Sequence, residues 1–217
     1  MDDPIGPRIG LPIAARAAPQ RKGEKTRDTI LNDAVSLASQ IGLEGLSIGA
    51  LATRSGMSKS GLFAHFGSKE DLQLATLSRA EGLFQQRVFT PAMESRQGLT
   101  RLRALLDHWL RWVDGSEDLP GGCLLFSAAS EYDDRPGPIR DRLAEGQREL
   151  RGAIAKSVRA AIDAGEIGAT TDPWQFTFEL YGVILAAYHE RRLLNDPRAA
   201  ERARRAFERI VGQPAAM

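Results

Sequence analysis

The chain has 217 residues, 42% of them hydrophobic, which is enough to bury a sizeable core in one large domain or two small ones. Its 29 basic and 28 acidic residues leave a formal net charge of +1, which excludes a globally basic protein, so any nucleic-acid surface depends on local segregation of charge. The single Cys123 excludes an internal disulfide framework, and no apolar run approaches the roughly 20 residues that span a bilayer. We therefore expect a cytoplasmic protein that does not enter a membrane.

Residues 1–23 are rich in Pro, Gly, Ala and Arg and show no sustained apolar period, which is typical of a flexible basic arm. From Glu24 onward apolar residues recur at helical spacing almost throughout, and no convincing alternating strand pattern is found. The fold is therefore predicted to be all-α. Its first helix is expected over residues 24–40, ending before Gly42.

The segment from Leu46 to Leu72 contains the most informative pattern. Two short helices, predicted over residues 48–54 and 59–66, flank a turn in which Gly56 takes a left-handed conformation without steric cost. This is the pattern of a helix-turn-helix, whose second helix stands clear of the body and enters the major groove of DNA.

Serine residues are expected at the starts of the neighbouring helices. Ser47 is placed to accept hydrogen bonds from the free N–H groups of the helix that follows it. Ser68, followed by acidic residues, marks the start of a long helix that runs to about Val88. Five further helices are predicted in the rest of the chain, over residues 99–113, 122–132, 139–164, 173–194 and 197–211.

The second short helix leads directly into the run Phe63-Ala64-His65-Phe66-Gly67-Ser68-Lys69-Glu70-Asp71-Leu72. Together with the first helix and the glycine turn, this run resembles the signature of the TetR family of bacterial transcriptional regulators. The resemblance is close from Lys25 to about Leu77. The remaining two thirds of the chain match only in their general make-up, as several helices with a final pair suited to dimerisation.

The resemblance implies a homodimeric repressor that binds palindromic operator DNA and is released by a small-molecule inducer. It implies a three-helix helix-turn-helix DNA-binding domain over residues 24–70, after the arm, and a larger helical ligand-binding and dimerisation domain over residues 71–217. We expect no enzymatic activity, no cofactor and no metal, because no Ser-His-Asp, paired-carboxylate or metal-ligand spacing is present.

Ten residues are predicted to contact DNA. Lys59 and Ser60 open the recognition helix and are expected to meet base edges or phosphates, while Gly61 indicates either close approach to DNA or tight packing. By resemblance, His65 and Lys69 contact phosphates, and a phosphate would offset the unfavourable placement of a lysine at a helix N-terminus. The other predicted contacts are Ser47, Thr53, Arg54, Ser58 and Phe63.

Phe63 departs from the family, in which a tyrosine is usual. Loss of the hydroxyl removes one hydrogen bond to a phosphate, worth about 1 kcal/mol.

The distribution of charge supports a DNA-binding surface independently, because the sequence from Arg8 to Lys69 contains nine basic and only four acidic residues. The arm that carries several of these basic residues either lies along a groove of the DNA or serves as a solubilising tail.

An inducer pocket is implied among the helices that follow. Its predicted walls are apolar and aromatic, which favours a lipophilic or aromatic inducer, although the same side chains also suit a plain core. Glu131 either orients a polar group of the ligand or is structural, and the apolar neighbours of Cys123 argue against an oxidant-sensing thiol. The predicted lining residues are Phe84, Leu105, Trp109, Trp112, Cys123, Phe126, Phe176 and Tyr181.

The last two helices are expected to form the homodimer through an apolar stripe, the alternative being that they pack only within one chain. The stripe consists of Phe176, Leu180, Val183, Ile184, Ala187 and Tyr188. Three other functions stay open: an activator or ligand-independent regulator with the same DNA-binding helices, a helical enzyme or ligand carrier, and a structural adaptor without salt-dependent affinity for DNA.

Overall fold

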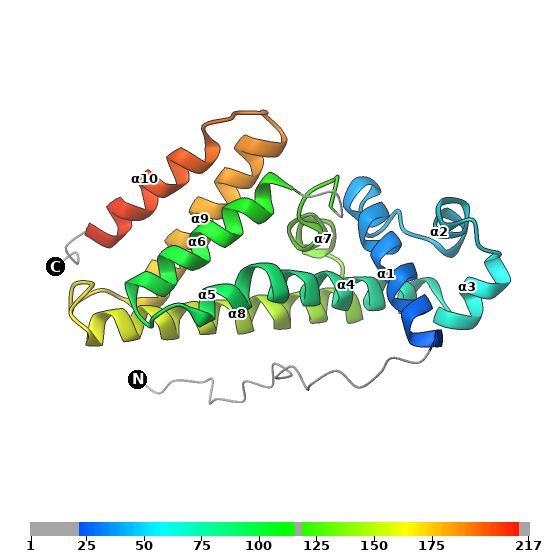
Figure 1. The fold of residues 1–217 in the computed structure, drawn as a ribbon, viewed down its shortest axis with the longest axis horizontal. Helices are drawn as coiled ribbons and strands as arrows, with labels where there is room; N and C mark the ends of the chain where they lie inside the picture. Colours follow the sequence, from blue (N-terminus) through cyan, green and yellow to red (C-terminus); the bar gives the residue numbers. More distant parts are fainter. Residues whose placement is uncertain (1–21, 116–118, 213–217) are drawn as a thin grey trace.

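Helices make up most of residues 22–115 and 119–212, which are the parts of the chain that this computed structural model describes (Figure 1). Within these ranges no residue lies in a strand, so the predicted all-α fold is confirmed. The arm expected over residues 1–23 lies outside the described residues except for its last two, which already belong to the first helix.

Three short or medium helices come first: α1 (Lys22–Ile41), α2 (Ile48–Ser55) and α3 (Lys59–Phe66). The remaining elements include one π-helical segment, η1. In chain order they are α4 (Lys69–Phe84), η1 (Gln85–Phe89), α5 (Thr90–Glu94), α6 (Leu99–Asp114), α7 (Leu124–Tyr132), α8 (Pro138–Asp163), α9 (Pro173–Arg192) and α10 (Ala199–Gly212).

Serine side chains start α2, α3 and α4, as expected for residues that satisfy the free N–H groups of a first helical turn. The Oγ atoms of Ser47, Ser58 and Ser68 accept hydrogen bonds of 3.0–3.1 Å from the backbone N–H three residues further on. Gly56 lies in the left-handed region with φ 67°, as the helix-turn-helix pattern predicts. These local signals place α2 and α3 where the sequence predicts them.

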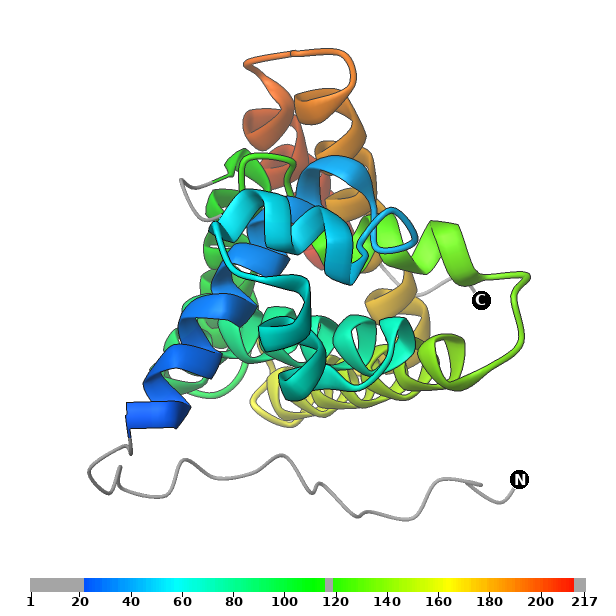
Figure 2. The ribbon, with the colours of Figure 1, turned by 90° about the vertical axis from the view of Figure 1, so that its right-hand side faces the viewer.

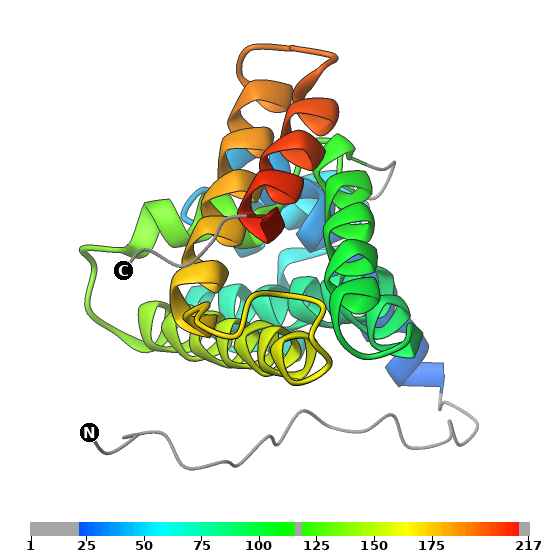
Figure 3. The same cartoon turned by 90° about the vertical axis from the view of Figure 1, so that its left-hand side faces the viewer.

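The helices form two groups joined by α4 (Figure 1). At one end of the molecule α1, α2 and α3 pack around a small core. From this end α4 continues through η1 and α5 as one helical rod alongside α8. On the other side α6, α9 and α10 pack together, and Figure 3 shows α9 and α10 side by side on the outside of the molecule.

The long helix that starts at Ser68 differs from the prediction at its far end. It was expected to end near Val88, but it passes through η1 and ends at Glu94. The wider turn of η1 ends two residues before Pro91, which has no N–H to donate to that turn. A second correction concerns α7, which begins after Gly122 because that glycine has φ 92° and the following residue is extended.

One glycine outside the helices lets the two groups of helices meet. The N–H of Gly121 donates to the Oγ of Ser39 on α1 at 3.1 Å. A Cβ atom at position 121 would collide with the backbone carbonyl of Ser39, so this close approach depends on the missing side chain. The segment before α7 is thereby fixed against the first helix.

Replacing Gly121 by alanine should therefore lower the free energy of unfolding by about 1–3 kcal/mol, because backbone atoms on one side have to move. Gly152→Ala is the matched control, since Gly152 lies inside α8 with no atom within 4 Å of an added Cβ. That variant should raise the free energy of unfolding by about 0.5–1 kcal/mol. Denaturant unfolding followed by circular dichroism measures both, and equal shifts in the two variants would contradict the close approach.

Candidate nucleic-acid interface and ligand cavity

The outer face of α3 carries the side chains that are predicted to reach DNA, and the helix lies at the end of the molecule that faces the viewer in Figure 2. Leu62 and Phe66 are buried and fix its inner face against the core. The outer face exposes Lys59, Ser60 and His65, together with Phe63, whose side chain is 58% exposed.

Lys59 carries an uncompensated positive charge at the start of α3. Among the described residues no carboxylate pairs with it, and its aliphatic stem lies over Gly49 of α2, where a Cβ would come within 3.7 Å of Cε. The neighbouring Ser58 accepts from the N–H of Gly61, and a Cβ at Gly61 would come within 3.1 Å of that serine oxygen. Tight packing against the cap thus accounts for Gly61, whether or not DNA also approaches it.

Three other predicted DNA contacts already have partners inside the protein. The guanidinium of Arg54 donates to the Oγ of Ser36 on α1 at 2.9 Å. The hydroxyl of Thr53 donates to the carbonyl of Gly49 at 3.1 Å, and Ser47 caps α2. Each has a structural role, and a contact with DNA stays a prediction for all three.

Lys69, at the start of α4, is held by a carboxylate. Its Nζ lies 2.8 Å from an oxygen of Glu44, in the loop between α1 and α2. The hydroxyl of Tyr132 donates to the other oxygen of the same carboxylate at 2.8 Å. These two hydrogen bonds, that from Lys69 first, hold the pKa of Glu44 below its usual range. Glu44 therefore pairs with Lys69 in the way that the sequence analysis predicted for a DNA phosphate.

The loop that contains Glu44 is bound by side chains from two other helices. The carboxylate of Glu131 on α7 accepts from the backbone N–H groups of Leu43, at 3.2 Å, and Glu44, at 2.9 Å. The buried amide of Gln73 on α4 donates to the carbonyl of Leu43 at 2.7 Å. Glu131 is therefore structural, and the partners lie 30–88 residues apart, so no sequence signal announces them.

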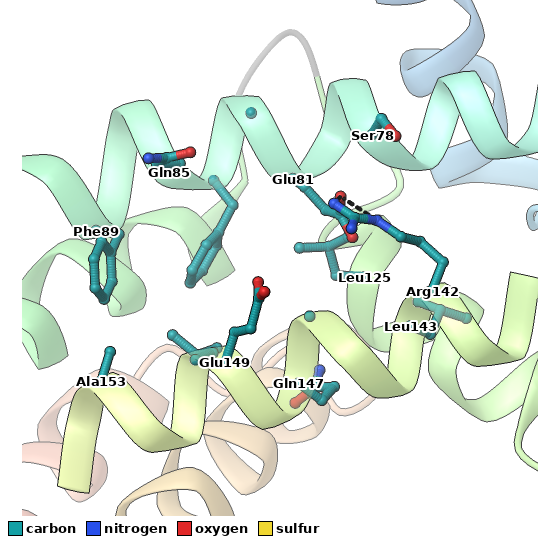
Figure 4. A pocket seen from close by; sticks show the side chains of 14 residues that line it. Ser78, Glu81, Gln85, Phe89, Leu125, Arg142, Leu143, Gln147, Glu149 and Ala153 are labelled. Carbon is teal, nitrogen blue, oxygen red and sulfur yellow. Dashed lines mark hydrogen bonds and ion pairs between the residues drawn. The ribbon is translucent and has the colours of Figure 1, made fainter. Parts of the chain in front are cut away.

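A cavity of about 330 Å³ lies between α4 and α8 (Figure 4). This volume falls within the roughly 300–1,000 Å³ of small-molecule sites. Glu81 of α4 and Arg142 of α8 form an ion pair across it, with Nη2 2.5 Å from Oε2. The lining residues are Ser78, Glu81, Gly82, Phe84, Gln85, Phe89, Leu125, Arg142, Leu143, Gly146, Gln147, Glu149, Leu150 and Ala153.

Only Phe84 of the eight residues predicted for the pocket lines this cavity. Three of the others, Trp109, Phe126 and Tyr181, form a cluster of aromatic rings next to it, with ring centroids 5.7–6.1 Å apart. The remaining four are buried in the core: Leu105, Trp112, Cys123 and Phe176. Ligand contact by these seven residues stays a prediction, because each already has close protein neighbours.

Cys123 is only 2% exposed, and burial raises the pKa of its thiol. A reactive cysteine needs access and a lowered pKa, so the environment of this thiol does not favour oxidant sensing. In the described part of the chain, no group of three or more His, Cys, Asp or Glu side chains is placed to hold a metal ion. None of the described helices combines the length and apolar character needed to cross a bilayer.

Two family models match the chain. One, described as bacterial regulatory proteins of the tetR family, matches residues 30–76, which include α2 and α3. The other, described as a tetracyclin repressor-like C-terminal domain, matches residues 98–207. No curated protein matches the chain.

Solved structures of regulators are similar over most of their length. A TetR transcriptional regulator from Chloroflexus aurantiacus J-10-FL is 26% identical, with a TM-score of 0.77 over 88% of this chain and 95% of that one. Reduced NemR from E. coli is 21% identical, with a TM-score of 0.74 over 88% and 100% of the two chains. AibR, in complex with isovaleryl coenzyme A and operator DNA, is 22% identical, with a TM-score of 0.65 over 84% and 94%.

Proposed function

The chain belongs to the TetR family of bacterial transcriptional regulators, and on that premise we propose that it is a repressor that binds a palindromic operator as a homodimer and is released by a small molecule. It acts in the cytoplasm and has no catalytic role in this proposal. Residues 24–70 serve as the DNA-binding domain and residues 71–217 as the ligand-binding and dimerisation domain. The structure of AibR holds both operator DNA and isovaleryl coenzyme A. By analogy, it supports the proposal that this protein binds both DNA and a small molecule.

The observation that carries the proposal is the outer face of α3. The helix is capped, anchored by two buried residues and exposed along its other side, and the lysine at its N-terminus pairs with no carboxylate of residues 22–115 or 119–212. A rigid helix of this kind fits the major groove, and its N-terminal N–H groups and lysine attract phosphates. Release follows if the ligand binds more tightly to a state in which the two recognition helices no longer fit successive major grooves.

A continuous helix connects the ligand cavity to this face. α4 contributes Glu81 and Phe84 to the cavity and carries Lys69 at its other end. A second connection runs through α7, where Leu125 lines the cavity and Tyr132 donates to Glu44. A displacement of either helix by a ligand therefore changes the position of residues next to α3.

The function is tested by binding to the DNA upstream of the protein's own and adjacent genes, with a scrambled duplex as reference, at several salt concentrations. Selective binding with a steep salt dependence is expected. Lys59→Ala should weaken it and reduce the slope of log K against log salt by about 1. Lys156→Ala, which removes an exposed lysine from α8, is the control and should change neither quantity. Equal loss in both variants would refute contact through α3.

Lys69 should bind phosphate better when Glu44 no longer competes for it. Glu44→Gln keeps an acceptor for Tyr132 but removes the ion pair, and operator affinity should rise about two- to fivefold, as expected for an exposed pair. Glu70→Gln removes the same charge from a neighbouring exposed position that has no ion pair among the described residues. Its effect should be smaller, and an equal rise in both variants would contradict competition at Lys69.

The proposed dimer uses α9 and α10, but not the stripe that the sequence indicated. Phe176, Leu180, Ile184 and Ala187 of that stripe are buried inside the single chain. A different row of α9, spaced four residues apart, is exposed instead. It starts with two large aromatic side chains, of which Phe178 is 72% exposed, and continues with small residues that allow close approach: Trp174, Phe178, Gly182 and Ala186.

Phe178→Glu should convert the dimer to a monomer of 23.7 kDa, because it places a charge in an apolar interface. Sedimentation velocity measures the mass, and operator affinity should fall with it because both half-sites no longer bind one particle. Phe63→Glu introduces the same change at another exposed phenylalanine, on α3, and should leave the mass unchanged. An unchanged mass in both variants would place the interface elsewhere.

A further inference from the structure

The lining of the cavity between α4 and α8 includes an exposed carboxylate that pairs with no described residue. Glu149 of α8 points across the cavity toward α4 (Figure 4), and among the described residues no hydrogen bond or ion pair reaches it. Carboxylates line the site in excess, because Glu81 lies on the opposite wall and Arg142 supplies the single guanidinium among the lining residues. Glu145, outside the lining, lies 3.4 Å from the same guanidinium. The local charge around the cavity is therefore negative.

Glu81 is poorly solvated and only partly compensated. Burial raises the pKa of this carboxyl, which the hydrogen bond from Arg142 opposes, and the negative charges of Glu149 and Glu145 raise it further. A positive charge placed between Glu81 and Glu149 would relieve this repulsion. Arg142 is already used by Glu81 and Glu145 and offers little to an anionic ligand.

A second polar atom on the cavity wall lacks a donor. The Oε1 atom of Gln147 is buried, and no hydrogen bond reaches it within the described part of the chain. A buried acceptor without a donor costs free energy. The Gln147 amide lies next to the hydroxyl of Tyr181 on α9. Gln147 and Glu149 are two residues apart on α8, so their side chains point in different directions and one ligand group cannot reach both.

The rest of the cavity suits an apolar body. Phe84 and Phe89 supply aromatic rings, and Leu125, Leu143 and Leu150 supply aliphatic walls. An aromatic ring attracts a cation placed over its face. Space is left because α4 has no side chain at Gly82, where an added Cβ would meet nothing within 4 Å.

From these observations we propose that the cavity binds an organic cation: a protonated amine on an apolar, aromatic body, with its ammonium group between Glu149 and Glu81. This inference rests on the proposed function, in which a small molecule releases the protein from DNA, and it specifies the chemical class of that molecule. The amine is recognised by charge and hydrogen bonding, and the body by burial of apolar surface.

Three probes with one carbon skeleton test the charge preference: 4-phenylbutylamine, 4-phenylbutan-1-ol and 4-phenylbutyrate. Calorimetric titration of the full chain should give the amine an affinity about tenfold or more above that of the alcohol, with the carboxylate weakest. Equal affinity of amine and alcohol, tighter binding of the carboxylate, or no binding of the amine each overturns the proposal.

Variants locate the site. Glu149→Gln is isosteric and should reduce amine affinity about tenfold while changing alcohol affinity less than twofold, because only the charge is lost. Glu94→Gln, which removes an exposed charge from α5 outside the cavity, is the control and should change neither. Gly82→Leu fills the cavity and should abolish binding of all probes, whereas Gly82→Ala leaves room and should retain it. Amine binding that survives Gly82→Leu would overturn the location.

Failure here is distinguishable from failure of the proposed function. Operator binding by the unliganded protein, and its weakening by Lys59→Ala, do not depend on the class of ligand. A protein that binds its operator but not the amine refutes the organic cation alone. A protein that binds the amine with the expected response to Glu149→Gln, yet shows no selective DNA binding, refutes the repressor and leaves the cation site standing.

Discussion

The hydrogen bonds that hold the loop between α1 and α2 decide where the DNA-reading helices sit. Two backbone N–H groups of this loop donate to Glu131 of α7, and one backbone carbonyl accepts from Gln73 of α4. Leu43 and Leu46, in the same loop, are fully buried. Loop backbone that is bound and buried in this way cannot shift without losing several contacts at once, so α4 and α7 position α2 and α3.

This arrangement gives Glu44 two opposed roles. Its carboxylate stabilises Lys69 and the hydroxyl of Tyr132 in the structure without DNA, where an unpaired lysine at a helix N-terminus is unfavourable. The same charge repels the phosphates that α3 has to approach. An exposed ion pair contributes little to stability, typically about 0–1 kcal/mol. In the proposed DNA complex, Lys69 would therefore exchange Glu44 for a phosphate at low cost.

The cavity shows a comparable compromise. Burial makes the charge of Glu81 costly in this cavity, and the buried amide oxygen of Gln147 has no donor among the described residues. Helix packing alone would favour apolar residues at these positions, and leucine or alanine in place of Gly82 would favour helix formation. These residues lower the stability of the protein without a ligand, and an amine would compensate their charge. They are therefore consistent with a site that is stabilised when it is filled.

Signals within a few residues of one another were enough to predict the helix-turn-helix. Helical hydrogen bonds join residues four apart, and capping bonds join residues about three apart, so Ser47, Gly56, Gly67 and Ser68 identify the ends of their helices from local sequence alone. The motif that contains Phe63 and Lys69 indicated which family the chain belongs to. For the same reason the positions of most later helices were predicted to within two residues, apart from the helix that continues past Val88 to Glu94.

The partners of charged and apolar side chains were decided only by the tertiary structure. Apolar periodicity identifies one buried face of α9 but cannot distinguish a face that packs within the chain from one that awaits a second copy, because both bury the same kind of atoms. The links from Glu44 to Tyr132 and from Glu131 to Leu43 span 88 residues each. The cavity, likewise, is the space that α4 and α8 leave unfilled, and it depends on how two distant helices lie against each other and not on the pattern of either one.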